Sequence, residues 1–183
     1  NIYEASKKAM LEAIDKVRDT SSSHERVNII EVMGRHCGDL ALYAGLAGGA
    51  ETIIVPEVDY KIEDVCVRLE TTKKRGKRHS IILLAEGVGN ANDIGKQIVE
   101  RTGADLRVTV LGHVQRGGSP TVFDRLLASR LGVRAVELLL DGQSARVVGI
   151  RDDKIIDMEI HEALSMKKEF DKKSYQMAQI LSI

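Results

Sequence analysis

The alternation of short apolar runs with helical segments is the feature that most constrains the fold of this chain. Four runs rich in valine and isoleucine, at residues 27–33, 51–55, 80–85 and 106–111, are each followed by a segment suited to a helix. Apolar strands of this kind are buried on both faces, which is typical of a parallel sheet covered by helices on both sides. The sequence therefore predicts the α/β class, with a three-layer, doubly wound and mostly parallel sheet.

The expected helices cover residues 3–18, 39–48, 62–74 and 92–101. A longer helix is expected to begin with Ser119 as its cap and Pro120 in its first turn, to end near residue 141, and to be mostly buried. Two short runs, at 145–150 and 155–158, flank four charged residues and indicate a hairpin, after which one or two helices end the chain.

Composition limits the classes of partner. The 183 residues carry 27 basic and 27 acidic side chains, so no overall field attracts nucleic acid or an anionic membrane. No apolar run reaches membrane-spanning length, and Cys37 and Cys66 lack metal-ligand spacing and are expected to be reduced. We therefore expect a cytoplasmic protein that binds neither nucleic acid nor membrane.

Glycine-containing loops follow three of the predicted strands, at residues 33–39, 85–89 and 111–120. Ligands of open α/β sheets bind beyond the carboxyl ends of the strands, where glycines let the backbone approach them. Arg35, His113 and Arg116 could hold an anion, and Glu86 could accept hydrogen bonds from sugar hydroxyls. Tight turns with a surface arginine or a solvated glutamate explain the same residues without a ligand.

A basic cluster at residues 75–79 (RGKRH) lies between a predicted helix and a predicted strand. Cations at a helix carboxyl end complement the helix dipole, so the residues alone favour a solvated helix end over a binding site, and the same holds for Arg18 and Arg26. The sequence has no Walker-type phosphate loop, nucleophile elbow or Cys/His metal cluster, which disfavours hydrolases and metalloenzymes.

Three segments carry a family likeness: residues 18–26 (RDTSSSHER), 33–39 (MGRHCGD) and 111–120 (LGHVQRGGSP). In order and spacing they resemble signatures of the bacterial ATP-dependent 6-phosphofructokinases. The resemblance implies an allosteric homotetramer of glycolysis that, with Mg²⁺, transfers the γ-phosphoryl group of ATP to the 1-hydroxyl of fructose 6-phosphate. It also implies that the family's nucleotide loops and catalytic base lie before Asn1, so this chain alone is expected to bind rather than catalyse.

The resemblance assigns two sets of residues. Arg35 would be the only catalytic residue, by stabilising the transferred phosphoryl group, and Arg26 and Arg107 would serve the site of a neighbouring subunit. Residues that match the fructose 6-phosphate site are Arg26, Met33, Gly34, Arg35, Glu86, Arg107, His113 and Arg116. Residues that match the effector site, for a nucleoside diphosphate or phosphoenolpyruvate, are Arg18, Glu51, Arg75, Lys77, Arg78 and His79. Glu51 would reach the effector through magnesium.

The resemblance also implies a division of the chain. We expect residues 1–118 to form a sugar-phosphate-binding α/β domain, 119–150 to return to a nucleotide-binding domain outside this chain, and 151–183 to form a hairpin and helices. Two rival functions remain at this point: a pyrophosphate-dependent phosphofructokinase, and a non-catalytic sugar-phosphate-binding regulatory domain.

Overall fold

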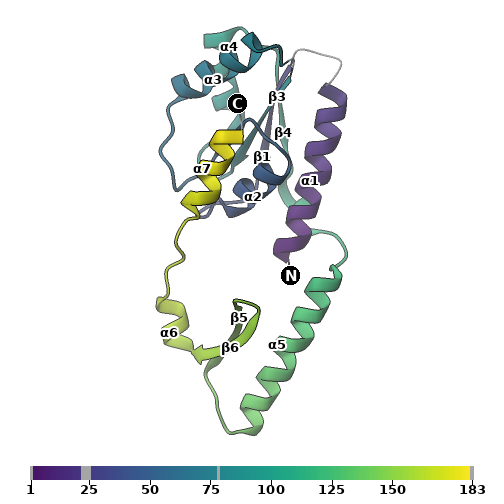
Figure 1. Cartoon of the computed structure of the whole chain (residues 1–183), viewed down its shortest axis with the longest axis vertical. Helices are drawn as coiled ribbons and strands as arrows, with labels where there is room; N and C mark the ends of the chain where they lie inside the picture. The colour runs from purple at the N-terminus through teal and green to yellow at the C-terminus, as the bar shows by residue number, and fades with distance from the viewer. Residues whose placement is uncertain (1, 22–25, 78, 182–183) are drawn as a thin grey trace. The chain divides into compact units, whose positions relative to one another are not determined.

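The chain divides into two compact units. The computed structural model describes residues 2–21, 26–77 and 79–181 (Figure 1). The larger unit comprises Ile2–Gly118 and Phe170–Ile183, and the smaller comprises Ser119–Glu169. The predicted boundary after residue 118 therefore coincides with the division in the structure.

The larger unit contains a four-stranded sheet in the order β2-β3-β1-β4, with all of its pairings parallel. Its strands are β1 (Arg26–Val32), β2 (Thr52–Ile54), β3 (His79–Ala85) and β4 (Leu106–Val110). Strand β1 is central, and its Ile29 lies opposite Ile82 of β3 and Val108 of β4. The α/β class and the parallel sheet are confirmed.

Helices cover both faces of this sheet. They are α1 (Ile2–Ser21), α2 (Asp39–Ala47), α3 (Ile62–Lys74), α4 (Ala91–Thr102) and α7 (Lys172–Leu181). Ile30 of β1 packs with α1, α2 and α7, whereas its neighbour Ile29 packs with α3 and α4. Successive residues of a strand point to opposite faces of the sheet. Neighbouring apolar residues of one strand therefore contribute to the apolar cores on both sides.

Helix α7 packs against α2 in the larger unit. The Tyr43 hydroxyl of α2 donates to Asp171 Oδ2 at 3.1 Å, and Ser174 donates to the same carboxylate from its hydroxyl (2.6 Å) and its amide (3.0 Å). Burial, followed by this bond to Asp171, raises the pKa of Tyr43. The predicted grouping of residues 151–183 is therefore wrong, because residues from Phe170 onward belong with the sheet.

The smaller unit contains the predicted hairpin. Its elements are α5 (Val122–Leu140), β5 (Arg146–Arg151), β6 (Lys154–Glu159) and α6 (Ile160–Ser165). The antiparallel strands turn at Asp152 and Asp153, which both have positive φ. The predicted boundary between residues 150 and 151 is wrong because it would separate two strands of one hairpin.

Helix α5 differs from its prediction at its start and in its burial. Thr121, not Ser119, is the cap, and it exchanges bonds with Asp124 in a capping box, which fixes the first turn. Leu138 is buried, but most of the other apolar side chains of α5 are exposed, so the expected mostly buried helix is not observed within this chain. None of the helices in the described part of the chain is long and apolar enough to cross a membrane.

Candidate functional site

The carboxyl ends of β1, β3 and β4 meet at one edge of the sheet because β1 lies between the other two. The loop after β1 carries Met33, Gly34 and Arg35, the loop after β3 carries Glu86, and β4 leads to a 3-10 helix, η1 (Gly112–Arg116). The structure thus brings together, at one edge of the sheet, the six predicted sugar-phosphate residues that lie on these three loops: Met33, Gly34, Arg35, Glu86, His113 and Arg116.

Glycines allow the first two loops to touch. The Gly87 amide donates to the Gly34 carbonyl at 3.1 Å, and the Gly34 amide lies 3.5 Å from Glu86 Oε1. A Cβ atom on Gly87 would lie only 2.0 Å from the Arg35 carbonyl oxygen, and Gly34 has a φ of 150°, which side chains disfavour. Glycine is therefore required at both positions.

Gln115 connects the loop after β1 to η1. Its side chain is buried, with Oε1 accepting from the Met33 amide at 3.1 Å and Nε2 donating to the Gly112 carbonyl at 3.1 Å. The hydroxyl of Ser6, on α1, donates to the Gln115 carbonyl at 2.7 Å. The sequence expected this glycine-rich loop to lead directly into a helix, but η1 forms first and α5 begins only at Val122.

Three basic side chains at this edge are exposed. The side chains of Arg35, His113 and Arg116 make no hydrogen bond or ion pair with any residue that the structure describes. Guanidinium groups form paired, charge-assisted hydrogen bonds with phosphate. This edge of the sheet can therefore bind a phosphorylated ligand, with Glu86 available to accept bonds from hydroxyls.

Glu57 supports the loop after β1, and sequence reasoning missed it. Both of its carboxylate oxygens accept from the Gly38 amide, at 2.8 and 3.0 Å. Gly38 is also required for space, because a Cβ atom there would lie 2.4 Å from Val55. The signal that could have identified Glu57 is its position just beyond the carboxyl end of β2.

Arg26 and Arg107 lie near the other end of the sheet, at the first residue of β1 and the second residue of β4. A strand rises about 3.3 Å per residue, so the seven residues of β1 separate its two ends by roughly 20 Å. Arg26 is paired with Asp105, with 2.8 Å between Nε and Oδ2. Neither arginine can reach the loops at the carboxyl edge of its own chain.

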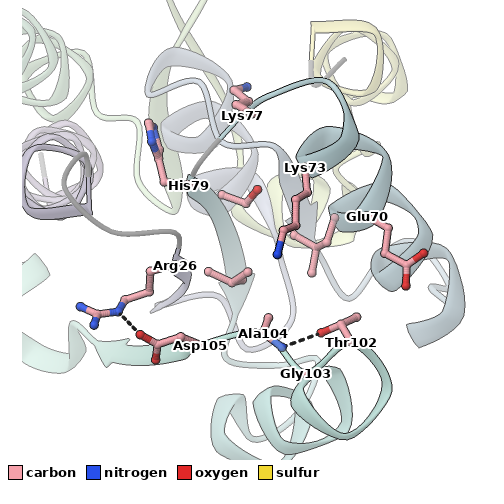
Figure 2. Close-up of a pocket in the computed structure, with 12 residues that line it drawn as sticks. Arg26, Glu70, Lys73, Lys77, His79, Thr102, Gly103, Ala104 and Asp105 are labelled. Atoms are coloured by element: carbon pink, nitrogen blue, oxygen red, sulfur yellow. Dashed lines mark hydrogen bonds and ion pairs between the residues drawn. The ribbon is translucent and has the colours of Figure 1, made fainter.

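A cavity of about 140 Å³ opens between α3, α4 and the amino ends of the strands. Figure 2 shows Arg26, Lys73, Lys77 and His79 around it, with the pair Arg26–Asp105 at one side. Sequence reasoning had assigned Arg26 to a different site from Lys77 and His79, and it missed Lys73. The repeated basic residues at the end of α3 were the signal for Lys73, but they also fit a solvated helix end.

The remaining predicted effector residues are dispersed around this end. Glu51 is buried, and its carboxylate accepts from Lys77 Nζ at 2.8 Å and from the Ile81 amide at 2.6 Å. Arg18 donates to the Gly48 carbonyl and, at 3.1 Å, to that of Gly49. Arg75 is exposed at the end of α3 and lines a separate hollow. Arg78 lies outside the described residues.

The structure thus defines an α/β domain with exposed basic side chains at the carboxyl edge of its parallel sheet. The family model described as phosphofructokinase matches residues 3–139 of this chain. The chain therefore belongs to the phosphofructokinase family.

Two curated relatives illustrate the extent of the similarity. The ATP-dependent 6-phosphofructokinase of Clostridioides difficile (strain 630) is 73% identical over 181 residues, and that of Alkaliphilus metalliredigens (strain QYMF) is 58% identical over the same length. Each match covers 99% of this chain and 57% of the relative, so the chain spans little more than half the length of these proteins.

Solved structures agree with this assignment. Phosphofructokinase from Saccharomyces cerevisiae matches with a TM-score of 0.80 and 34% identity, covering 98% of this chain and 24% of that one. A pyrophosphate-dependent phosphofructokinase from Marinobacter aquaeolei matches with a TM-score of 0.79 and 23% identity, covering 94% of this chain and 49% of that one. At that identity the second match supports the fold alone.

Proposed function

We propose that this chain supplies the fructose 6-phosphate site of an ATP-dependent 6-phosphofructokinase, which transfers the γ-phosphoryl group of ATP to the 1-hydroxyl of the sugar. The observation that carries the proposal is the set of exposed cations, Arg35, His113 and Arg116, on adjacent loops at the carboxyl edge of the sheet. The names of the similar curated proteins favour ATP over pyrophosphate as the donor.

The proposed roles follow from the chemistry of each group. His113 and Arg116 bind the 6-phosphate, Met33 and Gly34 contact the sugar, and Glu86 accepts a hydrogen bond from a sugar hydroxyl. Arg35 stabilises charge on the phosphoryl group as it is transferred. Phosphoryl transfer depends chiefly on positioning and electrostatic stabilisation, which are the contributions that these side chains can make.

Magnesium would neutralise phosphate charge on ATP when bound. The proposed fructose 6-phosphate site does not require that its own side chains coordinate this ion. Among the described residues, no group of three or more His, Cys, Asp and Glu side chains could hold a metal ion. Glu51 does not fit the role of effector magnesium ligand in this arrangement, because Lys77 and the Ile81 amide engage its carboxylate. We therefore assign the metal to the nucleotide.

The distant positions of Arg26 and Arg107 support an oligomer. Because neither can reach the carboxyl edge of its own sheet, we propose that each serves the sugar-phosphate site of a neighbouring subunit in a homotetramer. Cytoplasmic glycolysis is the proposed setting. The exposed apolar side chains of α5 support the proposal that this helix belongs with a nucleotide-binding domain.

The basic amino-end region is the proposed effector site, for a nucleoside diphosphate or phosphoenolpyruvate. Arg75, Lys77 and His79 supply its cations, with Arg18 at the end of α1. An effector bound there would regulate the sugar-phosphate site only if the two sites are coupled through distinct quaternary states.

The test of the proposed function is Arg116→Ala in the full-length enzyme. Loss of charge-assisted bonds to phosphate should raise the KM for fructose 6-phosphate by roughly 10- to 100-fold and leave the KM for ATP unchanged. Arg101→Ala, which removes an exposed arginine of α4, is the matched control. An unchanged KM for fructose 6-phosphate in Arg116→Ala would contradict the proposal. Activity of the wild-type enzyme with pyrophosphate but not with ATP would show that pyrophosphate is the phosphoryl donor.

A further inference from the structure

Gln115 is the only side chain of η1 that is buried; it is 1% exposed and lies between residues assigned to the sugar phosphate, His113 and Arg116. A polar side chain that leaves water this completely needs partners for its amide groups. Gln115 has them on both sides, at the Met33 amide and at the Gly112 carbonyl. A side chain in this position is too deep to contact a ligand held by the exposed cations.

The two bonds of the Gln115 amide join separate loops. Met33 precedes Gly34 and Arg35 at the end of β1, whereas Gly112 begins the 3-10 helix that carries His113 and Arg116. A single amide group therefore fixes the distance between the backbone that carries Arg35 and the backbone that carries Arg116. Ser6 holds the Gln115 carbonyl from α1, so the main chain of Gln115 is anchored as well.

We propose that Gln115 is a positioning residue that sets the spacing of the two cationic loops, so that Arg35 and Arg116 act on one ligand. The proposal rests on the proposed function, since it assigns both arginines to the same sugar phosphate. A misplacement of about 1 Å between groups that bind and stabilise one ligand can cost 100-fold in rate. Gln115 acts on the substrate through these loops, without contacting it.

The bonding pattern gives Gln115→Glu a signature that a merely structural role would not produce. A protonated glutamate can accept from the Met33 amide and donate to the Gly112 carbonyl, as glutamine does, whereas a glutamate anion has no proton for Gly112. Burial raises the pKa of such a carboxyl group toward neutrality. The variant should therefore recover as the pH falls.

Several charged or ionisable side chains lie around this position and would act on the new carboxyl group. They are His113 and Arg116 in η1, Arg35 and Glu86 in the adjoining loops, and Glu12 and Lys16 of α1, which line a hollow beside Gln115. Because the wild-type enzyme has a pH dependence of its own, the informative quantity is the ratio of variant to wild-type KM at each pH. In that ratio, the pH dependence that the variant and the wild type share cancels.

The experiment measures KM for fructose 6-phosphate in the full-length enzyme carrying Gln115→Glu or Gln115→Met, with Arg116→Ala in parallel. Loss of the Gln115 bonds should raise KM about 10-fold in Gln115→Met at every pH, with the KM for ATP unchanged. In Gln115→Glu the ratio to wild type should be about 10 near pH 8.5 and approach 1 near pH 6. Gln97→Glu and Gln97→Met, at an exposed position of α4, are the matched controls.

The outcomes separate this inference from the proposed function. Wild-type KM in both Gln115 variants, together with a raised KM in Arg116→Ala, overturns the positioning role and leaves the substrate assignment intact. A wild-type KM in Gln115→Glu near pH 8.5, where the anion has no proton to donate to Gly112, also overturns it. If Gln115→Met does not fold, Gln115→Glu at low pH, which keeps the full bonding pattern, still decides the question.

A measurement without ligand tests the role of Gln115 even if Arg116→Ala has no effect and the proposed function is wrong. Hydrogen exchange of the Met33 amide should be faster in Gln115→Met than in the wild type, because its acceptor is gone. Unchanged exchange at Met33 and its neighbours would show that Gln115 does not hold this loop, whatever the ligand.

Discussion

Cations at the two ends of the same parallel sheet differ in how many of them are paired with a carboxylate. At the carboxyl ends, Arg35 and Arg116 are exposed and have no partner among the described residues. At the amino ends, Arg26 is paired with Asp105 and Lys77 with the buried Glu51, whereas Arg75 and Arg107 are exposed. A free cation gains from an incoming phosphate, whereas a paired one must first give up its carboxylate, so the comparison favours the carboxyl end as the high-affinity anion site.

The largest expected effect tests the close approach of the loops at the carboxyl end. Gly87→Ala would place a methyl group against the Arg35 carbonyl, which cannot move without displacing the loop. We expect a loss of about 3 kcal/mol in the free energy of unfolding, measured by denaturant titration. Gly132→Ala, in open space on helix α5, should instead stabilise by up to about 1 kcal/mol. Equal behaviour of the two variants would refute this account of the loop contact.

The next effect tests the pairing at the amino end. Glu51→Ala removes the acceptor of the Ile81 amide and the partner of Lys77, although Lys77 is 40% exposed and can be hydrated. We expect a loss of about 2 kcal/mol in unfolding free energy. Glu70→Ala, an exposed position on α3, serves as the control and should change little. A stability like that of wild type in Glu51→Ala would mean that the amino end is not held by this pair.

A regulatory variant sharpens the assignment of the amino end. Arg75 is exposed at the carboxyl end of α3, so Arg75→Ala should cost only about 0.5 kcal/mol of stability. In the full-length enzyme it should abolish activation by a nucleoside diphosphate and keep the unregulated rate. Lys74→Ala, the neighbouring exposed cation, should retain activation. Normal activation in Arg75→Ala argues against the proposed effector site.

The smallest effect concerns Thr52, at the start of β2. Its hydroxyl is buried and has no hydrogen-bond partner among the described residues. Because Thr52→Val replaces an unsatisfied group by a methyl of similar shape, it should stabilise by about 0.5 kcal/mol. Thr72→Val, which loses a 2.8 Å bond to the Arg68 carbonyl, should destabilise by about 1 kcal/mol. Thermal unfolding compares the two, and a loss of stability in Thr52→Val would indicate that a bound water satisfies the hydroxyl.

Much of the fold could be predicted from local patterns. The sequence order of the four strands and of the helices between them was correct, because the strands are short runs rich in valine, isoleucine and leucine that are separated by helix-forming segments. The start of α5 was placed too early because Ser119 and Pro120 resemble a helix start, although Thr121 and Asp124 make the capping box. The exposure of α5 could not be predicted from its own composition. Apolar residues indicate that a helix is buried, but they do not show which other element packs against it.

The candidate site was predictable to a similar extent. The sequence identified the exposed cations, since arginines beside glycines after a strand are a local pattern. It missed the bonds that hold them, because Gln115 and Met33 are 82 positions apart, as Glu57 and Gly38 are 19 apart. The resemblance to the family grouped Arg26 with the substrate residues, although Arg26 lies at the first residue of β1, at the opposite end of that strand from the loop that carries Arg35.

The most direct test of the central claim is hydrogen exchange of the full-length enzyme with and without saturating fructose 6-phosphate, with fructose as the control. The sugar phosphate, but not fructose, should protect amides at residues 33–36, 86–89 and 112–118. Protection confined to residues 75–80 at the amino end, with none in the three carboxyl-end loops, would contradict it.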